Sequence, residues 1–130
     1  MDPTPGRILI ADDEPSLLKM MTAYLSRLGY PVTAVPTTAE AWSEMQADPA
    51  SFVCAVLDAT MAGMTMDELA RKMLGVNPQL RLLAASGFPV DVTSLEAEAP
   101  GRVAFLHKPF TPEMLATAVR SLLAPQEENI

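Results

Sequence analysis

The segment FVCAVLD, residues 52–58, places six apolar residues in a row before an aspartate. Its length suits a strand, and its uniform apolar character is typical of a strand that is buried on both faces. Three further short apolar runs lie elsewhere along the chain, at residues 8–11, 82–85 and 103–106. Strands of this type occur in parallel sheets that carry helices on both sides, so the sequence predicts an α/β fold.

Helix signals fill the intervals between these runs. The first helix is expected over residues 14–28, with an apolar stripe that reaches Leu28 and with Gly29 as its stop. A helix that begins with the capping-box pattern Thr65-Met66-Asp67-Glu68 is expected to end at Gly75. The remaining predicted elements are a strand at residues 30–35, a capping-box helix from Thr37 to about residue 47, a short irregular helix within 88–100 and a helix that begins after Thr111.

Length and composition suit a single domain. We expect it to span residues 7–124, between a tail at 1–6 and another at 125–130, because no linker or repeat interrupts the 130 residues. A net charge of −7 without a Lys/Arg cluster argues against direct binding to nucleic acid. No apolar stretch approaches the ~20 residues of a membrane helix, so we expect no membrane insertion and a cytoplasmic protein. The lone Cys54 is interpreted as a small buried hydrophobe.

Polar residues follow the apolar runs at the points where the strands are expected to end. They are Asp12, Asp13, Asp58, Ser86 and Lys108. In an open parallel sheet the ligand crevice lies outside the carboxyl ends of the strands, so residues distant in sequence meet there. The sequence therefore predicts one site that combines three acids, a hydroxyl and an amine.

Three clustered carboxylates predict a bound cation. At ~4 Å and an effective dielectric constant of ~20, each pair of like charges costs about 4 kcal/mol, which a divalent ion would offset. Ligands that are all oxygen favour Mg²⁺. A carboxylate beside such an ion and an ammonium group suits phosphoryl transfer, with Asp58 as nucleophile. Lys108 would balance phosphate charge, and Ser86 would hydrogen-bond a phosphoryl oxygen.

With these residues assembled, the chain resembles the receiver domains of two-component response regulators from about residue 7 to residue 124. The resemblance rests on spacing as well as on residue type, since 45, 28 and 22 residues separate the successive key positions. The matching motifs are Ala11-Asp12-Asp13-Glu14, Val56-Leu57-Asp58 followed by Met61, Ser86-Gly87 and Lys108-Pro109-Phe110.

The resemblance implies a fold and a reaction. The fold is a single-domain, flavodoxin-like (βα)5 three-layer sandwich whose parallel five-stranded sheet has the order 2-1-3-4-5. In the reaction, Asp58 takes a phosphoryl group from a phosphohistidine on a sensor histidine kinase or histidine phosphotransfer protein. Asp13, Asp58 and the backbone carbonyl of Thr60 hold Mg²⁺, and Asp12 acts through the metal's shell. The protein is then no enzyme beyond its own phosphorylation and dephosphorylation.

The resemblance also implies a switch that an unidentified downstream protein reads. Ser86 and Phe105 would couple phosphorylation to the face of the fourth and last helices, while Thr60 and Phe88 would tune the lifetime of the phosphate. Phe105 lacks the hydroxyl of a tyrosine, so a static core role for it stays open. The peptide between Lys108 and Pro109 is commonly cis in the family.

Departures from the family pattern lie in the loop after Asp58. Ala62 and Met66 stand there where the family usually has proline and glycine, so the loop geometry is open. The run Ser86-Gly87-Phe88 is more similar to receivers attached to sensor kinases than to those that feed DNA-binding domains. This similarity favours a phosphorelay or single-domain role.

Two rival functions remain. One is a receiver-like interaction module that acts without phosphorylation, which the altered loop permits. The other is a phosphohydrolase of the haloacid dehalogenase type, because residues 56–60 faintly resemble its nucleophile motif. The order of motifs argues against the hydrolase, since its nucleophile lies on the first strand and its acidic pair comes later. His107, the only histidine, is interpreted as structural.

Overall fold

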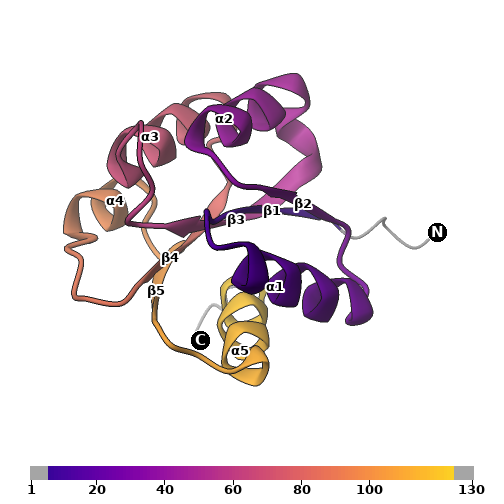
Figure 1. The fold of residues 1–130 in the computed structure, drawn as a ribbon. Helices are drawn as coiled ribbons and strands as arrows, with labels where there is room; N and C mark the ends of the chain where they lie inside the picture. The colour runs from indigo at the N-terminus through magenta and orange to yellow at the C-terminus, as the bar shows by residue number, and fades with distance from the viewer. Residues whose placement is uncertain (1–5, 125–130) are drawn as a thin grey trace, which may run out of the picture.

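The computed structural model describes residues 6–124, and within them five parallel strands form one sheet of order β2-β1-β3-β4-β5 (Figure 1). This order is the predicted one. Of the two predicted tails, residues 1–5 and 125–130 lie outside the described part of the chain. The strands are β1 (Arg7–Ala11), β2 (Val32–Val35), β3 (Phe52–Asp58), β4 (Arg81–Ser86) and β5 (Val103–His107).

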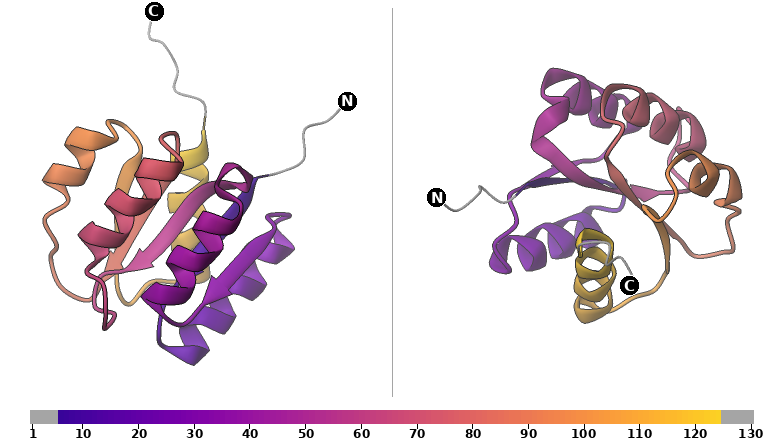
Figure 2. Two further views of the ribbon diagram at one scale, coloured as in Figure 1. Left: turned by 90° about the horizontal axis from the view of Figure 1, so that it is seen from above. Right: turned by 180° about the vertical axis from the view of Figure 1, so that it is seen from behind.

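Helices cover both faces of the sheet, which makes a three-layer α/β/α sandwich. One layer holds α1 and α5, and the opposite layer holds α2, α3 and α4, as two further views confirm (Figure 2). A short 3-10 turn precedes β3 at Pro49–Ser51. The helices are α1 (Pro15–Arg27), α2 (Thr38–Ala47), α3 (Met66–Val76), α4 (Thr93–Glu98) and α5 (Pro112–Leu123).

The strands alternate between the two helical layers, as the period of an extended chain requires. In β1, Ile8 and Ile10 join the core cluster that includes residues of α1 and α5, whereas Leu9 joins the cluster that includes residues of α2 and α3. All three side chains are fully buried. Continuing this alternation past the strand sends Asp12 and Asp13 to opposite faces of the sheet's edge.

Helix ends show where local signals succeeded and where they were wrong. Gly29 has a φ of 100° directly after α1, so it is the predicted stop. Leu28 is not part of the buried stripe, because it caps the helix and is 44% exposed. Gly75 does not end α3, which continues to Val76. The side-chain amide of Asn77 fixes that end by donating to the carbonyls of Pro49 and Phe52, both at 2.8 Å.

The predicted caps form to different degrees. Thr65 and Glu68 make the full capping box at the start of α3. Thr37 accepts from the backbone N–H of Glu40 at 3.1 Å, but the Glu40 carboxylate accepts from the Thr37 hydroxyl and not from its backbone. The N-terminus of α2 is therefore capped from one side only. Among residues 6–124, no helix has both the length and the apolar character needed to cross a membrane.

Candidate active site

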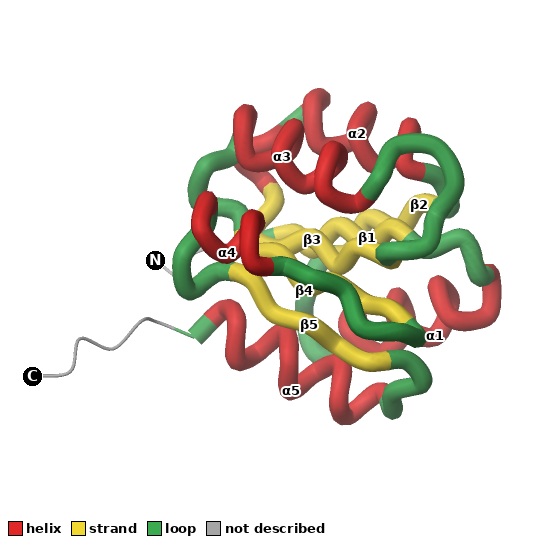
Figure 3. Tube along the Cα trace, turned by 90° about the vertical axis from the view of Figure 1, so that its left-hand side faces the viewer, coloured by secondary structure: helices red, strands yellow, loops and turns green. Residues whose placement is uncertain are grey.

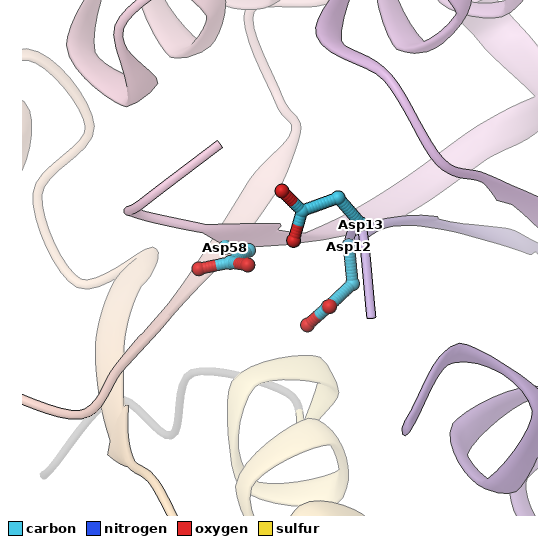
Figure 4. Close-up of side chains that lie close together, drawn as sticks. All are labelled: Asp12, Asp13 and Asp58. Carbon is cyan, nitrogen blue, oxygen red and sulfur yellow. The ribbon is translucent and has the colours of Figure 1, made fainter. Parts of the chain in front are cut away.

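Three carboxylates meet at the carboxyl edge of the sheet. Asp12 and Asp13 directly follow β1, and Asp58 ends the neighbouring β3, where Ala11 pairs with Leu57. Each acid offers an oxygen, and these oxygens all lie within 4.8 Å of one another (Figure 4). The strand register thus brings together acids that are 45 residues apart in the chain.

Lys108 completes the charged cluster from the loop after β5. Its Nζ lies 3.1 Å from Oδ2 of Asp12 and 3.4 Å from Oδ2 of Asp58. The Lys108 side chain is 18% exposed, and those of both aspartates are 2% exposed. The backbone N–H of Lys108 donates to the Ser86 carbonyl at 2.8 Å, and its peptide to Pro109 is cis. The backbone hydrogen bond to Ser86 therefore positions Lys108 so that its amine contacts Asp12 and Asp58.

Burial and repulsion act together on the first acid. Burial raises the pKa of Asp12, and the nearby charge of Asp58 adds to the rise. Hydrogen bonds from the Glu14 backbone and from Lys108 oppose it. Burial alone would lower the pKa of Lys108, but its hydrogen bond to Asp12 and the charges of Asp12 and Asp58 outweigh burial and raise it. Lys108 is therefore held in its charged form.

The cluster has the composition of a site for a hard divalent cation. Three carboxylates face one ammonium group, so two negative charges are left over when all are ionised. Within residues 6–124, no hydrogen bond or ion pair engages the carboxylate of Asp13, which is exposed. Oxygen donors and this charge balance fit Mg²⁺.

Thr60 orients the carboxylate of Asp58. Its backbone N–H and its hydroxyl both donate to Oδ1 of Asp58, at 3.0 Å and 2.8 Å. Oδ2 is left to face Lys108. Sequence reasoning missed this use of the Thr60 side chain, although Asp-x-Thr after a strand is a signal for a turn closed by the aspartate.

Ser86 lies beside the cluster on the next strand. It is fully buried and follows Ala85, which pairs with Asp58 across β3 and β4. Its hydroxyl accepts from the backbone N–H of Phe88 at 3.1 Å. Phe88 is 55% exposed in the loop that leads to α4, which Figure 3 shows as a long segment beside the sheet.

Phe105 and His107 lie along the edge strand β5. Phe105 is partly buried against the core on the side of α2 and α3. The two rings meet edge to face, with their centroids 6.2 Å apart. His107 is exposed at the end of the strand. Within residues 6–124, its side chain makes no hydrogen bond or ion pair with the acidic cluster.

Cys54 takes no part in this site. It is fully buried within β3, and burial raises the pKa of its thiol to about 12. The thiolate form is therefore absent near neutral pH, and the thiol is unreactive. The prediction of a small buried hydrophobe is confirmed.

Comparison with known proteins agrees with this geometry. A sequence model of the response regulator receiver domain matches residues 8–120. The response regulator receiver protein CpdR of Brucella abortus is 29% identical over 90% of this chain and 96% of its own length. The sensor kinase CckA of Brucella abortus is 27% identical over 92% of this chain, which spans only 13% of that kinase.

A solved structure shows the same fold. The response regulator receiver protein from Sinorhizobium medicae superposes with a TM-score of 0.78 at 29% identity, and the match covers 92% of this chain and 94% of that one. An acidic cluster that could hold a metal is typical of such domains. The chain belongs to the response regulator receiver domain family of two-component signalling systems.

Proposed function

We propose that Asp58 is the phosphoacceptor and that it receives its phosphoryl group from a phosphohistidine on a sensor histidine kinase or histidine phosphotransfer protein. An Asp58 oxygen attacks phosphorus, the P–N bond to the donor imidazole breaks, and an aspartyl phosphate forms. The observation that carries the proposal is the position of Asp58 between two further acids and Lys108. Such a carboxylate combines a nucleophile with the charges that neutralise phosphoryl oxygens.

The proposal includes a magnesium site in which Asp13, Asp58 and the backbone carbonyl of Thr60 are ligands and Asp12 contacts the metal's own shell. When bound, Mg²⁺ supplies positive charge against the oxygens of the transferring group. The all-oxygen donor set and its surplus negative charge support this assignment. Asp12 keeps its hydrogen bonds with Glu14 and Lys108, which suits an outer role.

The remaining residues act on the phosphoryl group and its lifetime. Lys108 pairs with a phosphoryl oxygen, and the Ser86 hydroxyl, whose oxygen accepts from the Phe88 backbone, donates its own proton to the phosphate. Ser86 and Phe105 then shift the population between two conformations that a downstream protein distinguishes. Thr60 and Phe88, which border the site, set how fast water attacks the aspartyl phosphate. That hydrolysis is the only turnover proposed.

The proposed domain spans residues 7–124, and the protein is proposed to act in the cytoplasm without binding nucleic acid itself. A single buried cysteine needs no oxidising compartment, and a net charge of −7 opposes contact with phosphate backbones. The similarity to a segment of the sensor kinase CckA, and to the solved receiver domain of a hybrid histidine kinase CckA, supports a histidine kinase or phosphotransfer protein as donor.

Mass spectrometry tests the proposed acceptor. A small-molecule phosphodonor with Mg²⁺ is expected to add one phosphoryl group to the wild-type protein and none to Asp58→Asn. Asp48→Asn, at an exposed position beyond α2, is the matched control and should be modified like the wild type. An unmodified wild-type protein beside a modified control receiver would favour the interaction module without phosphorylation. Turnover of phosphate esters would instead favour the hydrolase.

A further inference from the structure

One buried hydroxyl holds the middle of the loop that follows Asp58. Thr38, the first residue of α2, is only 6% exposed. Its Oγ1 donates to the carbonyl of Ala62 at 3.4 Å and accepts from the backbone N–H of Met64 at 3.2 Å. A single side chain from another element thus bridges two backbone groups on either side of Gly63.

The loop is folded closely over this hydroxyl. Gly63 has a φ of 93°, a conformation that residues with a side chain rarely adopt. A Cβ built at Gly63 would lie 2.7 Å from Oγ1 of Thr38, which is closer than real Cβ contacts. Conformation and space therefore both require glycine here, and the steric requirement arises from the approach to Thr38.

Both ends of the loop are fixed, and Thr38 supplies the intermediate support. At the start, Ala59 donates to the Ala85 carbonyl at 2.9 Å, and Thr60 is bound to Asp58. At the other end, Thr65 caps α3. Ala62 does not restrict the backbone between these points as proline would. Met61 and Met64 pack partly buried against the core, and the Thr38 bonds add the hydrogen bonds that fix the loop backbone at Ala62 and Met64.

Thr38 is itself held in place by a well-anchored helix. Thr37 caps α2 directly before it. On the same helix, Ala41 and Met45 are fully buried in the core. The position of the Thr38 hydroxyl is therefore set by packing that does not depend on the loop.

We infer that Thr38 is a positioning residue for the phosphorylation site, an inference that rests on the proposed function. By fixing Ala62 it holds the Thr60 backbone, two residues earlier, where the carbonyl can join Asp58 in binding Mg²⁺. Loss of the hydroxyl leaves Asp58 and its charged neighbours unchanged but frees the loop. The expected defect is weaker binding of Mg²⁺, not loss of the phosphoacceptor.

A set of threonine variants tests the inference. Thr38→Val keeps the shape and removes the hydroxyl, whereas Thr38→Ser keeps the hydroxyl. Thr22→Val is the matched control, because the Thr22 hydroxyl donates to the Leu18 carbonyl within α1 at 2.7 Å. Gly63→Ala disturbs the same contact from the loop side and serves if Thr38→Val fails to fold.

Two measurements are made by NMR and one by phosphorylation kinetics. In Thr38→Val, the amide of Met64 should exchange faster without metal. The Mg²⁺ concentration at half-saturation should rise about fivefold, because part of the free energy of the two lost hydrogen bonds must then come from Mg²⁺ binding. The phosphorylation rate at saturating Mg²⁺ should stay within about twofold of the wild type, since the nucleophile is intact. Thr38→Ser and Thr22→Val should match the wild type, and Gly63→Ala should shift Mg²⁺ binding in the same direction.

The outcomes separate this inference from the proposed function. An unchanged Mg²⁺ half-saturation in Thr38→Val, or an equal shift in Thr22→Val, overturns the role of Thr38. A wild-type protein that binds Mg²⁺ but accepts no phosphoryl group overturns the proposed function, while the Mg²⁺ titration still decides the role of Thr38. A wild-type protein that binds no Mg²⁺ overturns both.

Discussion

Asp12 and Asp13 are adjacent in sequence but lie in different environments. Asp12 is 1% exposed and accepts hydrogen bonds from the Glu14 backbone at 2.9 Å and from Lys108 at 3.1 Å. Asp13 is exposed and has no such partner within the described chain, yet its carboxylate reaches the same cluster. Asp13 therefore adds negative charge without compensation unless a cation binds.

Removing the charge of Asp13 is expected to stabilise the metal-free protein. In EDTA, Asp13→Asn should raise Tm by roughly 3 °C, because like-charge repulsion falls. Added Mg²⁺ should raise the Tm of the wild type by mass action and that of the variant much less. Thermal unfolding followed by circular dichroism measures both effects, with Asp48→Asn as the control. A variant that is less stable than the wild type in EDTA would contradict the proposed repulsion.

Lys108 has the opposite effect, because it compensates two buried carboxylates. Its pKa in the folded protein is raised above the ordinary 10.5, so its stabilising effect is complete below that pH and is lost as pH rises through the folded-state pKa. Lys108→Met should lower the free energy of unfolding by about 1–2 kcal/mol near neutral pH. Urea titrations should show that the difference in unfolding free energy between the wild type and Lys108→Met narrows above pH 10.5. Lys19→Met, on the exposed face of α1, is the control, and its free energy of unfolding should stay close to that of the wild type across the same pH range.

The fourth helix is the shortest of the described α-helices. It has six residues, well below the length at which an isolated helix is stable, so its tertiary contacts decide whether it forms. Leu95 anchors it in the core at 1% exposed. Arg71 of α3 restrains the exposed side of α4 through two hydrogen bonds. Its Nε donates to the Glu98 carboxylate at 2.7 Å, and a terminal nitrogen donates to the Ser94 hydroxyl at 2.9 Å.

Loss of the Arg71 contacts is expected to loosen α4 while leaving global stability nearly unchanged. In Arg71→Ala, amide exchange within Thr93–Glu98 should become several times faster, because an exposed pair contributes little to overall folding but restrains a short helix locally. Hydrogen exchange read by mass spectrometry measures this effect. Arg120→Ala, on α5 in the opposite layer, is the control. Equal exchange rates in α4 of both variants would count against the restraint.

The sheet has no free face, so its central strands carry much of the stability of the domain. Ile10 lies in β1, one of the inner strands, and is fully buried beneath α1 and α5. Ile10→Ala should lower the free energy of unfolding by about 3 kcal/mol, and Ile10→Val by about 1 kcal/mol, because the cavity grows with each methyl group removed. Chemical denaturation measures both values. Nearly equal losses in the two variants would show that the core refills the space.

The sequence by itself determined the strand–helix alternation and the identity of the residues at the strand ends. Uniform apolar runs mark strands buried on both faces, and such strands need a parallel sheet with two helical layers. From this alone, the meeting of Asp12, Asp13 and Asp58 was predictable, because parallel strands end at one edge. The strand order came from the resemblance to a family and is confirmed by the structure.

Only the tertiary structure decided how these groups are held. The hydroxyl of Thr38 reaches the loop after Asp58 across 24 residues of sequence, and Asn77 overrides the stop signal of Gly75 through contacts 25 and 28 residues away. Local patterns report the preferences of neighbouring residues. Hydrogen bonds between distant segments depend instead on how the layers pack, which no short stretch of sequence encodes.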